Sequence, residues 1–210
     1  MSEPTNIDHK DTWGLWANRL VRKKKLLAEM MWTSFIRLKC RFWKIYLGGG
    51  CRFWGNMHFQ RVPGSFISVG DNCRFRSATW SNLVGINRPC YLCTLRQGAK
   101  ITIGSGSGFS GTVISAAESI EIGSNVLCGA NVTITDTDWH HLDRTLEGIE
   151  PAPSAPVIIG SNVWLGMNVI ILKGVTIGSN SIISTNSVVS KSVPANVLAG
   201  GLPAKVIRKL

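Results

Sequence analysis

The chain has 210 residues, enough for one substantial domain with an appendage and for a core that needs no disulfide or metal. Its net charge is +11, and most of the excess lies in residues 1–62, which hold twelve Lys or Arg against four Asp or Glu. No apolar run approaches the roughly 18–20 residues that span a bilayer, and no secretory signal opens the chain. The sequence therefore excludes a membrane-spanning protein and indicates a cytoplasmic one.

Residues 1–62 are predicted to form a basic, amphipathic helical segment. Between residues 11 and 47, Trp, Leu, Met and Phe alternate with Lys and Arg, and neither Pro nor Gly interrupts the stretch from Gly14 to Gly48. Such a segment can make peripheral contact with an anionic membrane, or its apolar face can pack on the rest of the protein and cap it. Both interpretations stay open here. We expect no nucleic-acid partner, because no known reader motif accompanies the charge.

The six cysteines are scattered along the chain, as is typical of reduced, cytosolic thiols. Cys90 and Cys93 form a single CxxC motif without a second pair or a nearby His, so small buried hydrophobic residues are favoured over a zinc or redox site.

The dominant pattern is a six-residue repeat in the last third of the chain. Each hexad has an aliphatic first position, Asn, Gly or Ser at the fourth and Val or Ser at the fifth; the first positions are Ile159, Leu165, Ile171, Ile177, Ile183 and Val189. Neither a helix nor an ordinary strand has this period, which predicts a solenoid with the first position in its core. Asn and Gly tolerate positive φ, so the fourth position marks a corner. Similar hexads upstream extend the predicted solenoid from about residue 65 to about residue 194, with one interruption.

These hexads, followed by the closing sequence of residues 195–208, resemble the left-handed β-helix acyltransferases. That hexapeptide-repeat group includes galactoside, maltose and serine acetyltransferases and O-acetyltransferases of bacterial polysaccharide clusters. The resemblance implies an all-β solenoid, a left-handed parallel β-helix over residues 63–210. It also implies acetyl-CoA as co-substrate, no tightly bound cofactor, and a homotrimer with active sites between subunits.

The interruption predicts one extruded loop, residues 135–156, which holds two of the four histidines. Transfer of an acyl group to a hydroxyl needs a base of near-neutral pKa, and imidazole provides one. The resemblance selects His140, not His141, as this base, and Asp138 can orient its ring. We further assign Trp164 and Asp136 to acceptor binding. The alternative is that the acids and histidines of the loop are ordinary solvated residues.

The resemblance also indicates a CoA groove and excludes a metal. Matched residue by residue, the groove comprises Gly166, Thr185, Ser190, Lys191, Lys205 and Arg208. Lys205 and Arg208 can alternatively be solvated terminal charges. A γ-class carbonic anhydrase shares the fold but needs three zinc-binding histidines, and only His9 and His58 lie outside the loop. No metal site is therefore predicted.

Two departures from the galactoside enzymes limit the functional inference. Met167 stands where they carry a serine near the acetyl group, so a backbone N–H has to stabilise the oxyanion. Their sugar-contacting Asn and Asp have no counterparts around Phe109 and Ala117.

The resemblance implies an acetyl-CoA-dependent sugar O-acetyltransferase of bacterial surface polysaccharide biosynthesis, cytoplasmic or peripheral on the inner face of the membrane. The acceptor is then a sugar, lipid-linked if the helical segment binds lipid. The alternatives are N-acetylation of an amino sugar or an antibiotic, and a non-catalytic scaffold.

Overall fold

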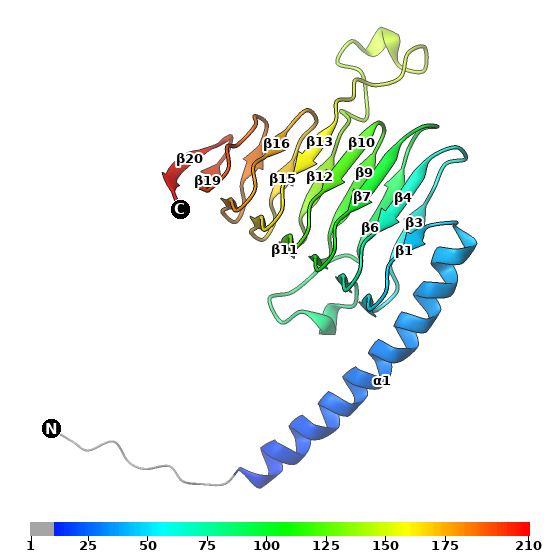
Figure 1. Cartoon of the computed structure of the whole chain (residues 1–210), viewed down its shortest axis with the longest axis vertical. Helices are drawn as coiled ribbons and strands as arrows, with labels where there is room; N and C mark the ends of the chain where they lie inside the picture. Colours follow the sequence, from blue (N-terminus) through cyan, green and yellow to red (C-terminus); the bar gives the residue numbers. More distant parts are fainter. Residues whose placement is uncertain (1–10) are drawn as a thin grey trace, which may run out of the picture.

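The computed structural model describes residues 11–210 as one helix followed by a solenoid of short strands (Figure 1). Three sheets of parallel strands run along the solenoid, each complete coil contributes one strand to each sheet, and the last strand of the chain pairs antiparallel with the strand before it in the second sheet. The first sheet contains β1 (Tyr46–Leu47), β4 (Phe66–Val69), β7 (Lys100–Ile103), β10 (Ser119–Ile122), β13 (Val157–Ile159) and β16 (Thr176–Ile177).

The second and third sheets repeat this arrangement. The second contains β2 (Arg52–Trp54), β5 (Arg74–Arg76), β8 (Gly108–Ser110), β11 (Leu127–Ala130), β14 (Trp164–Leu165), β17 (Ile182–Ile183), β19 (Val197–Gly201) and β20 (Ala204–Lys209). The third contains β3 (His58–Gln60), β6 (Tyr91–Thr94), β9 (Val113–Ala116), β12 (Thr133–Thr135), β15 (Ile170–Ile171) and β18 (Val188–Val189). We call the turn from first to second sheet the first corner, from second to third the second corner, and from third to first the third corner.

The core is formed by the aliphatic position of each hexad, as the sequence predicts. Parallel pairing stacks Ile122, Ile159 and Ile177 in register on successive coils, and all three are buried. The Val or Ser at the fifth position is also buried in every hexad from residue 159 onward. Near the first coils the core holds a stack of three aromatic rings, Phe53, Phe75 and Phe109.

Asparagine forms the corners. Asn162, Asn168, Asn180 and Asn186 take φ between 56° and 61°, the left-handed region that Asn tolerates better than other side chains. Their amides also bond from coil to coil: Asn162 Nδ2 donates to Asn180 Oδ1 at 3.1 Å, and Asn168 Nδ2 to Asn186 Oδ1 at 3.0 Å. The predicted role of the fourth position is thus confirmed for these asparagines.

The solenoid differs from the prediction at two places. It begins at Tyr46 and not near residue 63, because β1 to β3 already pair with the next coil. Residues 77–90, which include a 3₁₀ turn at Thr79–Ser81, leave the second corner as an additional extruded segment. In Figure 1 this segment and the loop of residues 135–156 project from opposite sides.

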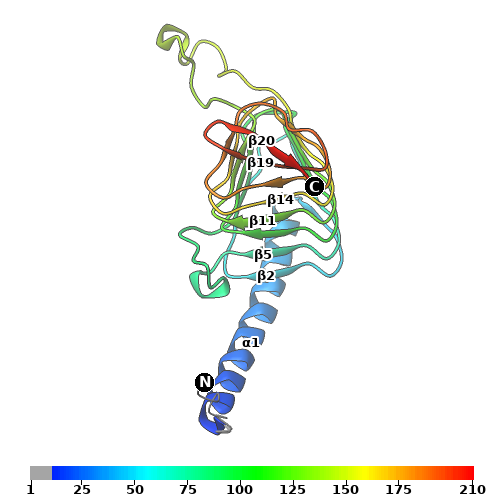
Figure 2. The same cartoon turned by 90° about the vertical axis from the view of Figure 1, so that its left-hand side faces the viewer.

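The predicted helical segment is a single helix, α1 (Thr12–Phe42), and residues 1–10 of that segment lie outside the described residues. The Asp11 carboxylate caps it by accepting the Gly14 N–H at 2.7 Å. Only Ile36 and Cys40 are fully buried, because the last turns pack on the first coil while the rest projects away from it (Figure 2). Within residues 11–210, no helix is long and apolar enough to cross a membrane.

The column of buried first-position side chains predicts that two neighbouring residues of β13 differ strongly in their contribution to stability. Ile159→Ala should lower the free energy of unfolding by about 2–5 kcal/mol, because the side chain is 1% exposed and the coils cannot close over the cavity. Ile158→Ala is the matched control, since the neighbouring Ile158 points outward and is 43% exposed. Urea unfolding of both variants measures the difference. Equal losses would contradict the assigned register.

Candidate active site

The base of the extruded loop is fixed by a buried carboxylate. Asp136 is 0% exposed and accepts the backbone N–H groups of Ala117 at 2.6 Å and Glu118 at 2.8 Å. Both donors belong to the coil below, so this residue ties the start of the loop to the solenoid. Asp136 was predicted in the acceptor site; in this chain its carboxylate is buried, and each of its oxygens accepts a backbone N–H group.

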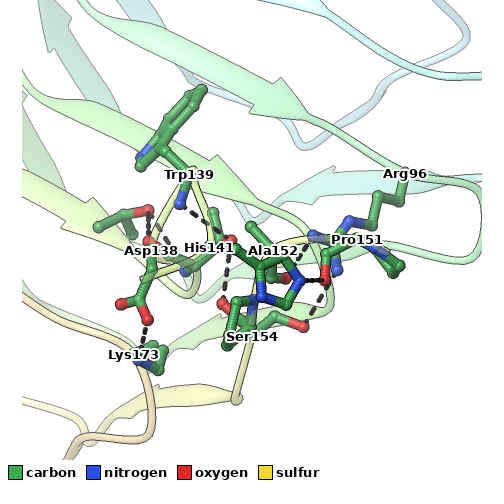
Figure 3. A network of polar contacts seen from close by, with 11 residues as sticks. Arg96, Asp138, Trp139, His141, Pro151, Ala152, Ser154 and Lys173 are labelled. Atoms are coloured by element: carbon green, nitrogen blue, oxygen red, sulfur yellow. Dashed lines mark hydrogen bonds and ion pairs between the residues drawn. The ribbon is translucent and has the colours of Figure 1, made fainter. Parts of the chain in front are cut away.

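The arm of the loop that returns to β13 is held by Arg96 (Figure 3). Arg96 Nη2 donates to the Ala152 carbonyl at 2.6 Å, and its Nη1 donates to Ser154 Oγ at 3.3 Å. Thr137 and Ser154 form an antiparallel bridge between the two arms of the loop. The loop therefore leaves the third corner through a narrow, hydrogen-bonded neck.

His140 lies beyond this neck and is oriented by a glutamate. Its Nδ1 is 2.8 Å from Glu147 Oε1, and Glu147 Oε2 accepts the His141 N–H at 3.2 Å and a bond from Arg144 at 3.3 Å. Hydrogen bonds from His140 and then from the His141 N–H hold the pKa of Glu147 below its usual value. In residues 11–210 no group hydrogen-bonds His140 Nε2. That nitrogen can accept a proton when Nδ1–H faces the carboxylate.

The partner of His140 differs from the prediction. Asp138 forms an ion pair with Lys173 on the next coil (Figure 3), and within residues 11–210 no hydrogen bond or ion pair joins it to His140. The orienting carboxylate is Glu147, seven residues further along the chain. The sequence contains no signal for this pair, because the 3₁₀ turn Arg144–Leu146 that brings Glu147 back is set by loop geometry.

The other loop residues frame a hollow at the same corner. His141 Nε2 lies 2.9 Å from the Pro151 carbonyl oxygen, so this imidazole links two parts of the loop and its Nε2 is occupied. Trp139 has φ of 67°, an uncommon conformation for an aromatic residue, and it is 52% exposed. The hollow under its ring measures about 210 Å³ and is lined by Leu95, Arg96, Ala117, Thr137 and Trp139.

The remaining predicted residues lie in two separate places, on the second sheet with its second corner and at the third corner. Gly166 and Thr185 stack at the second corner, where a Cβ on Gly166 would come within 2.6 Å of the Thr185 nitrogen. Lys205 and Arg208 belong to β20, which pairs with β19 on the same sheet as Trp164.

At the third corner, by contrast, Ser190 and Lys191 are exposed two coils above the loop that carries His140. The third sheet separates the two groups, so one chain does not bring His140 to Trp164.

The CxxC motif does not form a chelating site. Cys90 is buried, and burial raises the pKa of its thiol, whereas Cys93 lies on β6 with the opposite orientation to the core residue Leu92. Among residues 11–210 no cluster of three or more His, Cys, Asp or Glu side chains could hold a metal ion.

Comparisons with known proteins agree with this architecture. A family model described as bacterial transferase hexapeptide (six repeats) matches residues 156–191. The galactoside O-acetyltransferase of Escherichia coli K12 is 41% identical over 151 residues, 71% of this chain and 66% of that protein.

A second protein of that organism, provisionally named a lipopolysaccharide biosynthesis O-acetyl transferase, is 39% identical over 46% of this chain and 53% of its own. A solved galactoside acetyltransferase in complex with coenzyme A is 31% identical, with a TM-score of 0.51 over 78% of this chain and 64% of that one.

The stacked coils and the comparisons assign the fold to the parallel β-helices built from hexapeptide coils. The chain is similar to proteins of the hexapeptide-repeat transferase family, and the predicted left-handed β-helix is confirmed. The chain spans less than two thirds of the length of each of the three relatives described above.

The buried carboxylate at the loop base predicts a stability effect. Asp136→Asn should lower the free energy of unfolding by about 2–4 kcal/mol, because the amide oxygen can accept only one of the two backbone N–H groups and the amide NH₂ would face the other. Asp138→Asn is the control and should cost under about 1 kcal/mol, since its only ion pair lies near the surface. Denaturant titration measures both, and the reverse order would contradict the assignment.

Proposed function

We propose that the protein is an acetyl-CoA-dependent O-acetyltransferase acting on a sugar. The observation that carries this proposal is the His140–Glu147 pair on a loop extruded from a hexapeptide-repeat β-helix. An exposed imidazole whose second nitrogen is free suits proton transfer from a hydroxyl. The galactoside acetyltransferases among the relatives support the substrate class.

In the proposed reaction, His140 Nε2 takes the proton of a sugar hydroxyl as its oxygen attacks the carbonyl carbon of acetyl-CoA. The tetrahedral intermediate then collapses, the carbon–sulfur bond breaks, and His140 returns the proton to the departing CoA thiolate. Glu147 orients the ring and stabilises the imidazolium, a role like that of a triad acid. Met167 offers no hydroxyl, so a backbone N–H of the coil stabilises the oxyanion.

We propose that the working unit is a homotrimer. A single chain keeps His140 at the third corner and the predicted acetyl and CoA residues Trp164, Gly166, Thr185, Lys205 and Arg208 on the far side of the third sheet. A second copy would bring its loop against that side and complete the site. Ser190 and Lys191 of the copy that supplies His140 would then face the same CoA from the other wall.

The wider role we propose is in the cytoplasm, in the synthesis of bacterial surface polysaccharide. A relative provisionally named for lipopolysaccharide biosynthesis supports this role. The six reduced cysteines fit that compartment. The same machinery would accept an amine in place of the hydroxyl, so N-acetylation of an amino sugar or an antibiotic is the competing reaction, and acceptor profiling separates the two.

Replacement of the proposed base tests the reaction. His140→Ala should lower kcat by about 10²–10⁴ in a CoA-release assay with galactosides and maltose as acceptors, because general-base catalysis is lost. His141→Ala is the matched control and should retain activity within about tenfold, since its ring bonds only to the loop backbone. Unchanged turnover in His140→Ala, or wild-type protein that binds no acetyl-CoA, would favour a non-catalytic scaffold.

We also propose that α1 makes peripheral contact with an anionic membrane. An apolar stripe runs along its outer side, and each member is at least 39% exposed: Trp13, Trp16, Leu20, Leu27, Met31, Leu38 and Phe42. Residues two apart on a helix point to nearly opposite sides, so this stripe faces away from the buried Ile36 and Cys40.

The charge of α1 supports lipid over a second helix as the occupant of the stripe. Lys23 and Lys24 border it, and Glu29 is the one acidic residue of the helix. Three α1 helices packed through this stripe would bring six such cations together, whereas anionic lipid neutralises them. The stacked rings of Trp13 and Trp16 suit the interfacial region.

A vesicle assay tests this contact. Wild-type protein should bind vesicles that contain phosphatidylglycerol, and the double change Leu20→Gln with Leu27→Gln should weaken binding by at least about a hundredfold, because two leucines lose their burial. Asn18→Gln, which lies on the exposed opposite side of the same helix, should bind as wild type does. Sedimentation at low salt measures all three, and failure of the wild type to bind would end this proposal.

A further inference from the structure

The second sheet carries three arginines on its outer face near the first coils. Arg52 and Arg74 pair directly across β2 and β5, and Arg76 pairs with Trp54 one step along the same strands. Because side chains alternate along a strand, Phe75 enters the core while the arginines on either side of it point outward. Adjacent strands lie about 4.8 Å apart, so the cations share a small area.

This positive charge is largely unneutralised. Glu29 lies 3.4 Å from Arg52, and within residues 11–210 no carboxylate is in ion-pair distance of Arg74 or Arg76. Burial and the neighbouring Arg74 lower the pKa of Arg76, with Arg52 adding to this and Glu29 opposing it. An anion placed between the guanidinium groups would relieve this repulsion.

Arg76 is held in place before any ligand arrives. Its Nη1 donates to the Ser81 carbonyl of the extruded segment 77–90, and its guanidinium lies 4.6 Å from the centre of the Trp54 ring. Arg74, in contrast, is exposed, and its guanidinium makes no hydrogen bond within the described part of the chain. The pair thus combines one fixed cation with one free cation, and both line the same hollow.

The hollow above the arginines has a volume of about 210 Å³. It exists because β8 presents Gly108 and Ser110 where the strand below carries arginines. Leu127 on β11 forms its far wall, and Trp164 follows in register on β14. Three strand spacings, roughly 14 Å, separate β5 from β14, so the arginines and the proposed acetyl site lie along one face.

We propose that Arg74 and Arg76 bind a phosphate or diphosphate group of the acceptor, whose sugar ring occupies the hollow over Gly108 and Ser110. The acceptor is therefore a sugar attached through phosphate to a carrier, either a nucleoside or a lipid. The position of the sugar hydroxyl rests on the proposed acetyl transfer. The anion site itself rests on the arginines alone.

A binding measurement tests the anion site without any acetyl transfer. In calorimetric titration of the full chain with inorganic pyrophosphate, the wild type should bind and Arg74→Gln should bind at least about tenfold more weakly, since a charged hydrogen-bond donor is lost. Arg74 suits this test because its removal breaks no contact of the fold. Lys100→Gln, an exposed cation of β7 on the first sheet, should bind as the wild type does. No binding by the wild type, or equal binding by Arg74→Gln, would overturn the proposal.

An acceptor series identifies the carrier. One sugar is offered free, as a nucleoside diphosphate conjugate and as a short-chain polyprenyl diphosphate in detergent, and CoA release is followed. We expect kcat/KM for one diphosphate-linked form to exceed that for the free sugar by at least about tenfold, and Arg74→Gln to reduce this ratio while Lys100→Gln keeps it.

The diphosphate conjugate with the higher kcat/KM identifies the carrier as a nucleoside or a lipid, and either result supports the proposal. Preference for the free sugar would overturn the phosphate-linked acceptor but leave O-acetylation standing. Pyrophosphate binding without transfer to any acceptor would support the anion site and count against the proposed reaction.

Discussion

The structure depends on the in-register stacking of coils whose strands pair only with the coil before and the coil after. Each buried position meets its equivalent on the next coil, as in the column of Ile122, Ile159 and Ile177. An insertion within a strand would shift every later side chain to the wrong side. Additional residues can therefore enter only at corners, and both extruded segments, 77–90 and 135–156, leave from corners.

That constraint also explains where chemistry can arise. A core filled by aliphatic side chains has no interior site, so functional groups have to lie on extruded loops, on corners or on the outer sheet faces. His140 and Glu147 occupy a loop, Gly166 and Thr185 a corner, and Arg74 and Arg76 an outer face. The rigid coils hold the last two groups in fixed relation, because neighbouring strands cannot slide without breaking their backbone hydrogen bonds.

The sequence predicted what the six-residue period controls. The buried first and fifth positions and the left-handed asparagines follow from chemistry that each coil repeats, so they could be read without coordinates. The first coil escaped detection because the core residue of β2 is the aromatic Phe53, which departs from the aliphatic pattern.

The loop contacts escaped detection for a different reason. Asp138 and Glu147 are both carboxylates near His140, and their choice of partner depends on the fold of the loop. Lys173, the ion-pair partner of Asp138, belongs to the next coil, and the two residues are close in space only because the coils stack. Asp136 likewise looked available in the sequence, but two backbone donors of the coil below enclose it.

The last strand has a consequence for self-association. A stack of parallel strands ends in an open row of backbone donors and acceptors, onto which another solenoid could add and begin a fibre. Here the chain reverses after β19, and β20 covers that row in the antiparallel direction with Lys205, Arg208 and Lys209 along it. The helix packs against β1 and β2 at the opposite end of the stack, so addition of a further solenoid to the second sheet is hindered at both ends.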